Sequence, residues 1–583
     1  MKLSHIYLLA GLASANSMNM DMDMDMDMDM DMDMDPDNEP NGTTPTTNTN
    51  TDITPVPYVA GHLHGLPILE RPGLSPQEKL YWENYSTETF FTTDKGNRFA
   101  LRYHVVTISI VMFITYPITL ILNSVGSGWY LPWLAVNLGL TVSSLVLAGV
   151  FSATFPEQWY PGNIYEATSI VLFVLIIVHF VVAVLSRLAS SIVILDTQNY
   201  KPLDNDAIPL ERYNSDNTPS PTPGGAPGQG PLRIKVSPQA KFLNAKIFKV
   251  IWVQRIASTF GGLCSIIFHF LNYPLMLYIL FNNCVGLAVG NLFGKGPRVF
   301  NLLAHWIKGA VFVILGIVSL ARYCGIGQTK GWAWNRITYS NSERLHSRWL
   351  KYMPRGTITV EFIESFLIFF YGSTNVFLEH LAGAGGAWTA KDLQHVSIAF
   401  LYIGTGLCGL LSEIKLNNWR YHHTLETGGF TTDEIFAASP GYSPNPFPTL
   451  TIFWTGILMS QHAQASHTST QVHMQWGYLL SYGSFFRIFT FLILYFKPLR
   501  DGFPSKPITE VITSLCLLAG GLIFMESTDQ VIEAMDYRGY TPMFTFNVSV
   551  GFVALFMAWI MILCMWKQWL IQCKRVKEDT ERV

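Results

Sequence analysis

Apolar runs of about 20 residues, separated by short polar loops, recur from residue 104 to residue 566. Each run is long enough to cross a hydrocarbon core of ~30 Å as a helix, because an α-helix rises 1.5 Å per residue. The pattern predicts an all-α, polytopic membrane helical bundle with about 11 to 12 spans. The expected spans are 104–123, 131–152, 164–187, the tract 248–292, 300–321, 356–379, 392–413, 448–463, 473–496, 507–527 and 542–566.

A polar linker divides these spans into two membrane modules. Residues 196–245 carry "DNTPSPTPGGAPGQGP" at their centre, and this proline and glycine content predicts a flexible chain. The linker separates an amino-terminal module, 61–195, from a carboxy-terminal module, 246–570, which a cytosolic tail follows at 571–583.

The start of the chain has the pattern of a secretory signal. In "MKLSHIYLLAGLASANS", Lys2 precedes an apolar stretch and a small-residue cleavage site, which predicts a signal peptide over 1–15. Residues 16–60 alternate Met and Asp and then become rich in Thr, Asn and Pro, with too little apolar surface to order. We therefore expect a disordered exoplasmic tail, with glycosylation sequons at Asn41 and Asn84.

Lysine and arginine predict the sidedness of the loops. The loop 322–355 is strongly basic and should be cytosolic, as should the loop 497–506 and the carboxy-terminal tail. With a cleaved signal the number of crossings is then odd, so the tract 248–292 should cross once, its second part being re-entrant or interfacial. The chain is expected in a secretory-pathway membrane (endoplasmic reticulum, vacuole or plasma membrane), with an exoplasmic N-terminus and a cytosolic C-terminus. The basic residues of the first loop are Arg322, Lys330, Arg336, Arg344, Arg348, Lys351 and Arg355.

Composition narrows the chemistry. The 583 residues are 49% hydrophobic and 14% charged, too apolar for a typical soluble chain, and membrane lipids are the expected surroundings. The net charge of -3 argues against a nucleic-acid partner. The cysteines form no Cys-x-x-Cys pair, so no disulfide framework or thiolate zinc site is expected, and Cys573 is a palmitoylation candidate. No Walker loop, Gly-x-Ser-x-Gly or dinucleotide fingerprint is present, which argues against a transport ATPase and gives no basis for an enzyme.

Histidines and acids collect at the expected outer ends of the second module. "MSQHAQASHTSTQVHMQW" places three histidines around one external turn, and four acids from Glu526 to Asp536 have the spacing of one helical face. Imidazole with carboxylate suits zinc, iron or copper, and ionisable groups at membrane depth tend to mark sites. The alternative is that each group ends a helix and is satisfied by backbone or water. The candidate metal ligands are His305, His395, His462, His467, His473, Glu526 and Asp529.

Glu361 and Glu364 form a second polar feature. They are three residues apart in one span, on one helix face, and near its inner end. Carboxylates at this depth need partners. Two roles fit: a proton or cation relay, and a buried hydrogen bond that ties two helices together.

Long blocks of the second module resemble a fungal family. They include "HWIKGAVFVILGIVSLARY", "VEFIESFLIFFYGSTNVFLEH", "VHMQWGYLLSYGSFFRIFTFLILYF" and "GGLIFMESTDQVIEAMDYRGY". In this order they resemble the YTP-like family ("yeast putative transmembrane protein"), and the first module looks like the companion amino-terminal domain. The second module more distantly resembles the transmembrane protein forty-five group, whose recurring polar positions would correspond to His305, Glu361, Glu364, His395, His462, His467 and His473. The resemblance implies a membrane protein without an established biochemical activity.

The first module is similar to the cytochrome-b-type, ascorbate-reducible helical bundle, in which paired histidines hold two haems. His104 matches the first ligand position, and His269 could serve on a fourth helix. Asn137 and Tyr165 stand where further ligands would be expected. The resemblance therefore argues against bis-histidine haem, and a packed role is the default for these histidines and for His179.

Together these features predict a YTP-like membrane protein that handles a metal, copper or zinc, or electrons at its exoplasmic face. The alternatives are a non-catalytic membrane scaffold or trafficking protein, and a proton- or cation-coupled transporter that uses Glu361 and Glu364.

The Met-Asp run from Met18 to Asp35 lies on the same predicted side as the histidine cluster. The thioethers of methionine are suitable ligands for Cu(I). Slippage during replication also produces a two-residue repeat of this kind, without a function. We expect deletion of Met18 to Asp35 to leave membrane insertion intact and to weaken copper binding only. If copper titration of the isolated tail shows no binding, the run is a spacer.

Overall fold

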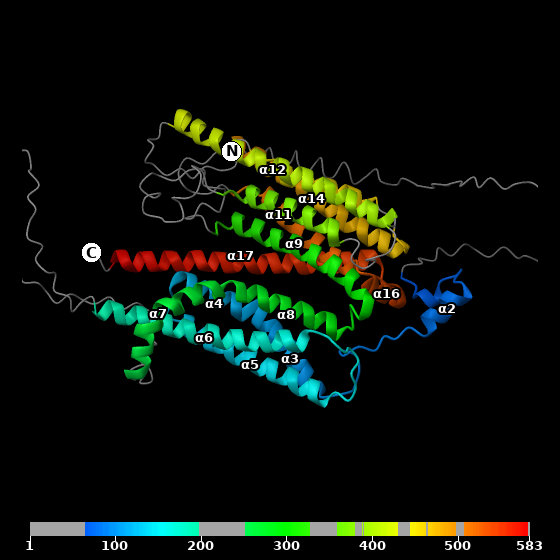
Figure 1. Ribbon diagram of the computed structural model, residues 1–583, viewed down its shortest axis with the longest axis horizontal. Helices are drawn as coiled ribbons and strands as arrows, with labels where there is room; N and C mark the ends of the chain where they lie inside the picture. The colour runs from blue at the N-terminus through cyan, green and yellow to red at the C-terminus, as the bar shows by residue number, and fades with distance from the viewer. Residues whose placement is uncertain are drawn as a thin grey trace, which may run out of the picture. The chain divides into compact units, whose positions relative to one another are not determined.

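The computed structural model describes residues 65–196, 251–326, 358–378, 388, 390–428, 444–461, 464–496 and 506–580. Within these residues the chain forms helices and no strand, so the predicted all-α membrane bundle is confirmed (Figure 1). In the described part of the chain, eight helices are long and apolar enough to cross a membrane, and a bent pair would add a ninth. The predicted signal peptide and the Met-Asp tail lie outside the described residues, as does the linker except for its first residue.

The first module consists of helices that pack around two apolar clusters. Tyr130 and Leu134 are at the centre of one cluster, and Leu172 and Ile176 at the centre of the other. The segment before the module forms two short helices, η2 (Ile68–Glu70) and α2 (Pro76–Glu83). The helices of the predicted first module are α3 (Arg98–Ile110), η3 (Val111–Thr115), α4 (Tyr116–Val125), α5 (Tyr130–Thr154) and α6 (Tyr165–Asp196). α7 (Ile251–Asn272) and α8 (Pro274–Gly290) follow the linker and were expected in the second module, 246–570, but they pack into the same two apolar clusters, so we include them in the first module.

The first span contains a π-helical turn, η3, between α3 and α4. Pro117 follows this turn and has no backbone N–H, so the regular hydrogen-bond ladder cannot continue through it. Asn137 of α5 is fully buried beside the turn and donates to the carbonyl oxygen of Thr115 at 3.2 Å and to Thr119 Oγ1 at 2.5 Å. Asn137 therefore has a structural role where the family resemblance had suggested a ligand position.

The described part of the tract 248–292, from Ile251, forms a broken helix whose two parts together run once along α6. α7 and α8 meet at a 44° bend just before Pro274. Gly261 packs against Ala189 near the end of α6, whereas the Tyr278 hydroxyl donates to the carbonyl oxygen of Thr168 at 3.0 Å, near its start. The pair is thus antiparallel to α6. The bent pair has the form of a broken span or of a re-entrant loop, so the prediction of one crossing stays a prediction.

The second module is a bundle in which glycines allow close helix approach. Gly309 of α9 faces Gly521 of α15, and Gly456 of α13 faces Gly477 of α14. Small residues at such contacts let helix backbones approach within a membrane. The helices of this module are η7 (Gly296–Arg298), α9 (Val299–Tyr323), α11 (Val360–Leu378), α12 (Ala390–Gly428), α13 (Phe447–Ser460), α14 (His467–Phe496), α15 (Thr509–Glu526), α16 (Asp529–Arg538) and α17 (Pro542–Thr580).

Two helices extend beyond the predicted spans. α12 continues to Gly428 rather than ending near 413, and α17 continues to Thr580 through most of the expected tail. α11 and α13 are not among the eight long apolar helices. The predicted count of about 11 to 12 spans stays a prediction.

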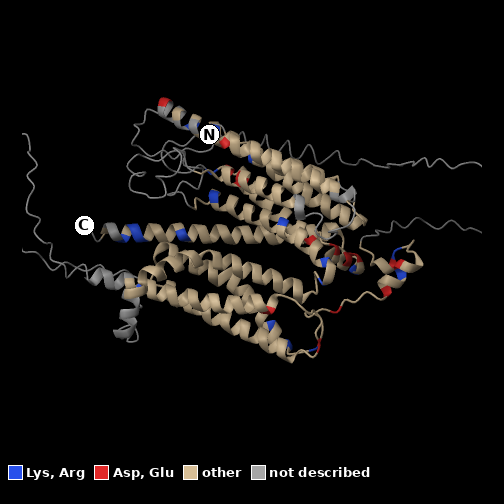
Figure 2. Cartoon of the chain, viewed as in Figure 1, with Lys and Arg blue, Asp and Glu red and all other residues tan. Residues whose placement is uncertain are grey.

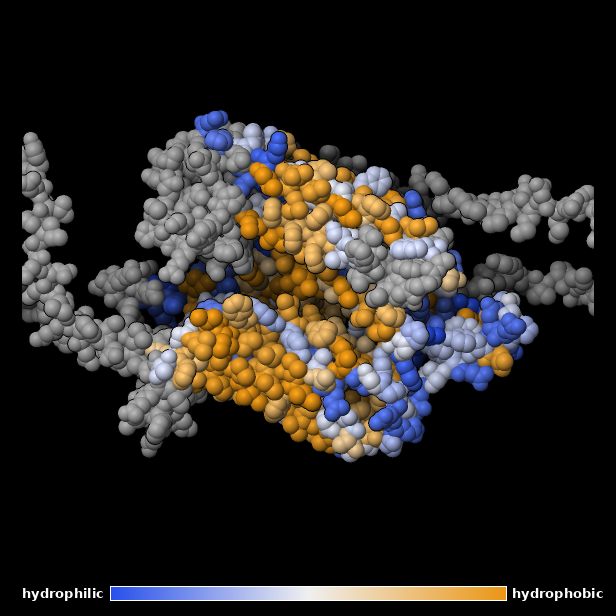
Figure 3. Space-filling view, viewed as in Figure 1, coloured by the Kyte–Doolittle hydropathy of each residue, from blue (hydrophilic) through white to orange (hydrophobic). Residues whose placement is uncertain are grey.

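The bundle has two distinct ends, and charged residues gather at both (Figure 2). At the α16 end, Arg71 pairs with Asp536 at 3.0 Å and Arg298 with Glu533 at 2.8 Å. At the opposite end, where α17 finishes, Lys574 Nζ donates to the carbonyl oxygen of Val125. An apolar surface covers much of the helix length between the ends (Figure 3).

Candidate functional site: a buried arginine–glutamate cluster

Three buried charged side chains meet between α11, α14 and α15. The Arg487 guanidinium lies 2.9 Å from Glu364 Oε1 and 4.0 Å from Glu510 Oε1. The side chains are 8%, 9% and 1% exposed, respectively. One cation thus stands between two carboxylates, and we call these three residues the Arg487 triad.

A second ion pair adjoins the Arg487 triad. Arg322 of α9 lies 3.5 Å from Glu361 Oε1, and Arg487 lies 3.9 Å from the same oxygen. A further buried pair joins Glu413 and Arg420 of α12 at 2.9 Å. Five helices therefore contribute charged groups to one buried region of the second module.

The cluster lies toward the end of the bundle where α17 finishes. Glu361 and Glu510 are in the first turns of α11 and α15, and Arg322 is in the last turn of α9. Acids at helix starts and bases at helix ends are favoured by the helix dipole, which helps to explain these positions. Arg487 is deeper, nine residues before the end of α14, or about 14 Å along the helix.

The Arg487 triad carries an unbalanced charge. If both carboxylates were ionised, one guanidinium would leave one negative charge in excess. An uncompensated buried charge costs several kcal/mol, which protonation of one carboxylate would remove. Glu510 is the less tightly paired acid, since Oε1 also accepts from the Ser319 hydroxyl at 2.8 Å and Oε2 is buried without a hydrogen bond in the described residues.

The structure brings the predicted pair Glu361 and Glu364 together with arginines that sequence reasoning had missed. Arg322 was expected in a cytosolic loop, but it is 3% exposed inside α9, so that assignment was wrong. Arg487 could have been found, because it is the single Lys or Arg within the apolar residues of α14. A lone charge in such a helix requires a partner.

At the α16 end, the structure brings together two of the candidate metal ligands. The rings of His305 and His473 are 5.8 Å apart, and the Nδ1 of each lies 2.8 Å from a main-chain carbonyl oxygen one turn earlier in its helix. His467 is exposed at the start of α14 and contacts Gln471, and His395 lies near the start of α12. His462 lies outside the described residues.

The predicted acidic face is divided between two helices. Glu526 ends α15, and the extended backbone at Thr528 separates it from α16, which contains Asp529. Glu526 accepts from the Ser549 hydroxyl at 2.6 Å, and the Asp529 amide donates to Asn301. Among the described residues, no group of three or more His, Cys, Asp or Glu side chains could hold a metal ion. The wider metal site stays a prediction.

In the first module, His104 is fully engaged by protein groups. Its Nδ1 lies 2.8 Å from Ser144 Oγ, and its Nε2 lies 2.5 Å from the Tyr165 hydroxyl. A metal–nitrogen bond of about 2 Å leaves no room between Nε2 and that hydroxyl. The other candidate, His269, shares a hydrogen bond with the carbonyl oxygen of Ser265 on its own helix. These residues, as arranged, do not fit a bis-histidine haem.

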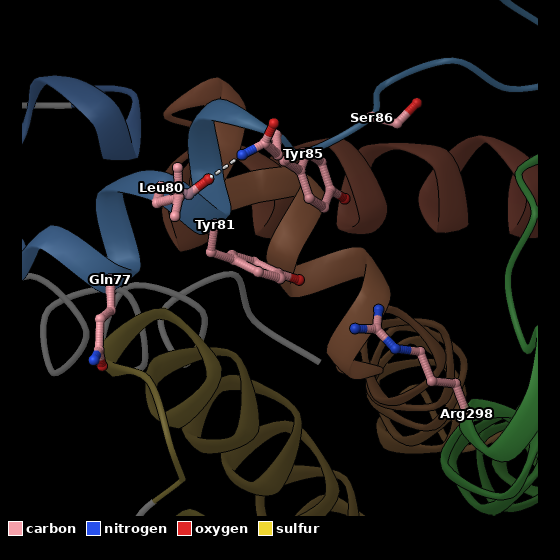
Figure 4. Close-up of a pocket in the computed structure, with 7 residues that line it drawn as sticks. Gln77, Leu80, Tyr81, Tyr85, Ser86 and Arg298 are labelled. Atoms are coloured by element: carbon pink, nitrogen blue, oxygen red, sulfur yellow. Dashed lines mark hydrogen bonds between the residues drawn. The ribbon is translucent and has the colours of Figure 1, made fainter.

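The segment before α3, residues 65–97, packs against the α16 end of the bundle. Tyr85 packs on Tyr537 with ring centroids 5.0 Å apart, and Tyr81 faces Arg298 across a surface pocket of about 550 Å³ (Figure 4). The Asn84 side chain donates to the carbonyl oxygen of Leu80 at 2.8 Å in the same place. The pocket is shallow and open, and the aromatic contacts around it hold the segment in place.

Comparison with known proteins places these features in a family. Residues 278–568 match the family described as "Protein YTP1-like, C-terminal", and residues 84–189 match a domain of unknown function, DUF2427. No solved structure matches the chain.

Three curated fungal proteins are similar to the chain. "Uncharacterized membrane protein YCR061W" of Saccharomyces cerevisiae is 50% identical, covering 90% of this chain and 91% of its own. "Uncharacterized membrane protein C3B8.06" of Schizosaccharomyces pombe is 33% identical over 82% of this chain and 94% of its own. "Protein YTP1" of Saccharomyces cerevisiae is 28% identical over 42% of this chain and 43% of its own. The chain is therefore an integral membrane protein that belongs to the fungal YTP1-like family.

Proposed function

We propose that this protein is a proton-coupled membrane transporter in which the Arg487 triad binds and releases one proton. The observation that carries the proposal is a charge imbalance: among the described residues, the buried carboxylates of Glu361, Glu364 and Glu510 share the two guanidinium groups of Arg322 and Arg487. Coupling of proton binding to transport requires, within the membrane, a group that is neutral when protonated and negative when ionised, as a carboxyl group is. The role predicted for Glu361 and Glu364 is thereby extended to Glu510.

Glu510 is the carboxyl group that holds the proton in this proposal. Ser319 Oγ lies 2.8 Å from Glu510 Oε1 and 3.4 Å from the main-chain carbonyl oxygen of Glu510. When Glu510 is ionised, the Ser319 hydroxyl donates to the carboxylate. When Glu510 is protonated at Oε1, its O–H donates to Ser319, whose own hydrogen turns to the carbonyl oxygen. Both protonation states are thus hydrogen-bonded without movement of a helix.

A scaffold protein could contain the same cluster as a static tie between helices. The two functions differ in whether the proton exchanges. In a static cluster, the protonated carboxyl group would not titrate while the protein stays folded. In a proton-coupled protein, it must lose the proton within that pH range.

Infrared difference spectroscopy of the purified full chain tests whether the buried carboxyl group loses its proton while the protein stays folded. We expect a protonated-carboxyl C=O band that disappears as the pH is raised and that is absent in Glu510→Gln. The matched control is Glu533→Gln, at the surface ion pair with Arg298, which should leave the band unchanged. If the band is lost in Glu364→Gln instead, the protonated carboxyl group is that of Glu364 and not that of Glu510.

Two results would overturn the proposal. One is a carboxyl band that does not respond to pH in the folded protein, which would support the scaffold. The other is a spectrum without a buried protonated carboxyl group at any pH. Proton uptake into proteoliposomes driven by a potassium diffusion potential, compared between wild type and Glu510→Gln, would give independent support.

A further inference from the structure

Two cysteines that are far apart in the sequence meet in the second module, toward the end of the bundle where α17 finishes. Cys324 directly follows the last residue of α9, and Cys564 is on α17. Their side chains form a hydrogen bond with each other. The Gln568 side chain, one turn after Cys564, donates to the carbonyl oxygen of Cys324 at 3.0 Å. One face of α17 therefore contacts Cys324 through two side chains.

The end of α9 holds the backbone at Cys324 in a fixed conformation. Gly325 has a φ of 79°, in the left-handed region that glycine adopts without strain. The Gly325 amide donates to the carbonyl oxygen of Arg322 at 3.0 Å, and the Ile326 amide donates to that of Ala321 at 2.9 Å. This is a common hydrogen-bond pattern at the C-terminus of a helix. The Cys324 side chain therefore extends from an ordered helix end.

The two thiols differ in their access to solvent. Cys324 is half-buried, whereas Cys564 is 7% exposed. The hydrogen bond from the Cys564 thiol lowers the pKa of the Cys324 thiol below its ordinary value, and the positive charge of Lys506 lowers it further, although burial opposes the change. Reactive cysteines are typically accessible, lie near cations and have a second thiol beside them. Cys324 thus has the properties of an attacking thiol, with Cys564 as its neighbour.

We propose that Cys324 and Cys564 form a reversible disulfide that links the end of α9 to α17 when the protein meets a small-molecule disulfide, glutathione disulfide. The Cys324 thiolate attacks one sulfur of glutathione disulfide, whose S–S bond breaks, and one glutathione leaves as a thiolate. The Cys564 sulfur then attacks the Cys324 sulfur of the mixed disulfide, and the second glutathione leaves. Two cysteine thiols are oxidised, and one glutathione disulfide is reduced to two glutathione molecules, which take up the two protons that the cysteines release.

The charge of the loops predicts that this end of the bundle faces the cytosol, where thiols are kept reduced. Both cysteines are free thiols in this structure. The link is therefore expected to form on oxidation and to open again on reduction. It would restrain α9 two residues beyond Arg322, but its formation does not depend on a proton at the Arg487 triad.

Peptide mass spectrometry of the full chain, purified in detergent and treated with glutathione disulfide, tests the link. Trypsin releases Cys324 in the peptide 323–330 and Cys564 in the peptide 539–567, and neither peptide contains another cysteine. We expect the two peptides to be joined after oxidation of the folded protein and to separate when excess reduced glutathione is added. Absence of the joined peptides from folded, oxidised wild type would overturn the proposal.

Three variants distinguish this pair from general thiol oxidation. In Cys564→Ala, we expect one glutathione to remain on Cys324, because the second thiol is missing. Cys324→Ala should leave the buried Cys564 unmodified. The matched control is Cys573→Ala, on the opposite face of α17, which should form the joined peptides as the wild type does. A lasting glutathione adduct on Cys324 in the wild type, or modification of Cys564 in Cys324→Ala, would contradict the proposed order of steps.

The unfolding temperature provides a second measurement, on the wild type itself. A disulfide restricts the unfolded chain, with a larger effect when the closed loop is long, and this loop covers most of the second module. We expect the oxidised wild type to unfold at a higher temperature than the reduced wild type, and Cys324→Ala to show no difference. An unchanged or lower unfolding temperature of the oxidised wild type would overturn the proposal, because a bond between thiols already in contact does not strain the folded protein.

Discussion

Arg487→Gln should strongly destabilise the folded protein. The substitution leaves the carboxylates of Glu364 and Glu510 buried without the guanidinium that lies between them. Breaking a buried ion pair by removing one partner typically costs about 3–5 kcal/mol. Thermal unfolding in detergent, followed as the fraction of monodisperse protein after heating, measures the loss.

A surface arginine provides the matched control for this prediction. Arg298, whose side chain is 47% exposed, pairs with Glu533 at 2.8 Å, so Arg298→Gln should cost at most about 1 kcal/mol. The instability of Arg487→Gln should decrease as the pH falls, because protonation neutralises the stranded carboxylates. The double variant Arg487→Gln, Glu364→Gln should recover part of the loss. Equal stability of the two single arginine variants would show that the Arg487 triad does not hold the helices together.

Gly521→Val should separate α9 from α15 and prevent normal assembly of the second module. A Cβ at Gly521 would lie 2.7 Å from the carbonyl oxygen of Gly309 and 2.9 Å from the amide nitrogen of Val313. Both are backbone atoms, so the clash can be relieved only if a helix moves. Overpacking of this kind costs typically about 1–3 kcal/mol, and occasionally more. The yield of folded protein and its unfolding temperature measure the effect.

Gly551→Val is the control for helix propensity and size. A Cβ at Gly551 of α17 would meet no atom within 4 Å, so this variant should behave as the wild type. The displacement caused by Gly521→Val should also disturb the charged cluster, since Ser319 of α9 contacts Glu510 of α15. A Gly521→Val protein with unchanged stability and an unchanged carboxyl infrared band would contradict the close packing of these two helices.

The apolar runs alone determined that this chain is a helical membrane bundle. Their length is sufficient because a backbone in hydrocarbon must satisfy its own hydrogen bonds, and a helix does so locally. The break in the tract 248–292 was visible at Pro274 for the same local reason, the missing N–H. Glu361 and Glu364 were recognisable because a carboxylate in an apolar run needs a partner.

Which partners those carboxylates have was decided only by the tertiary structure. Arg322, Arg487 and Glu510 are separated by 165 and 23 residues, and no local pattern links groups so distant in sequence. The tertiary structure also decided how the acids from Glu526 to Asp536 are arranged, because an extended residue interrupts their helical spacing. It likewise decided the partner of His104, because Tyr165 is on another helix. Local hydrogen bonding and apolarity determine helices, whereas side-chain packing between helices determines which charged groups meet.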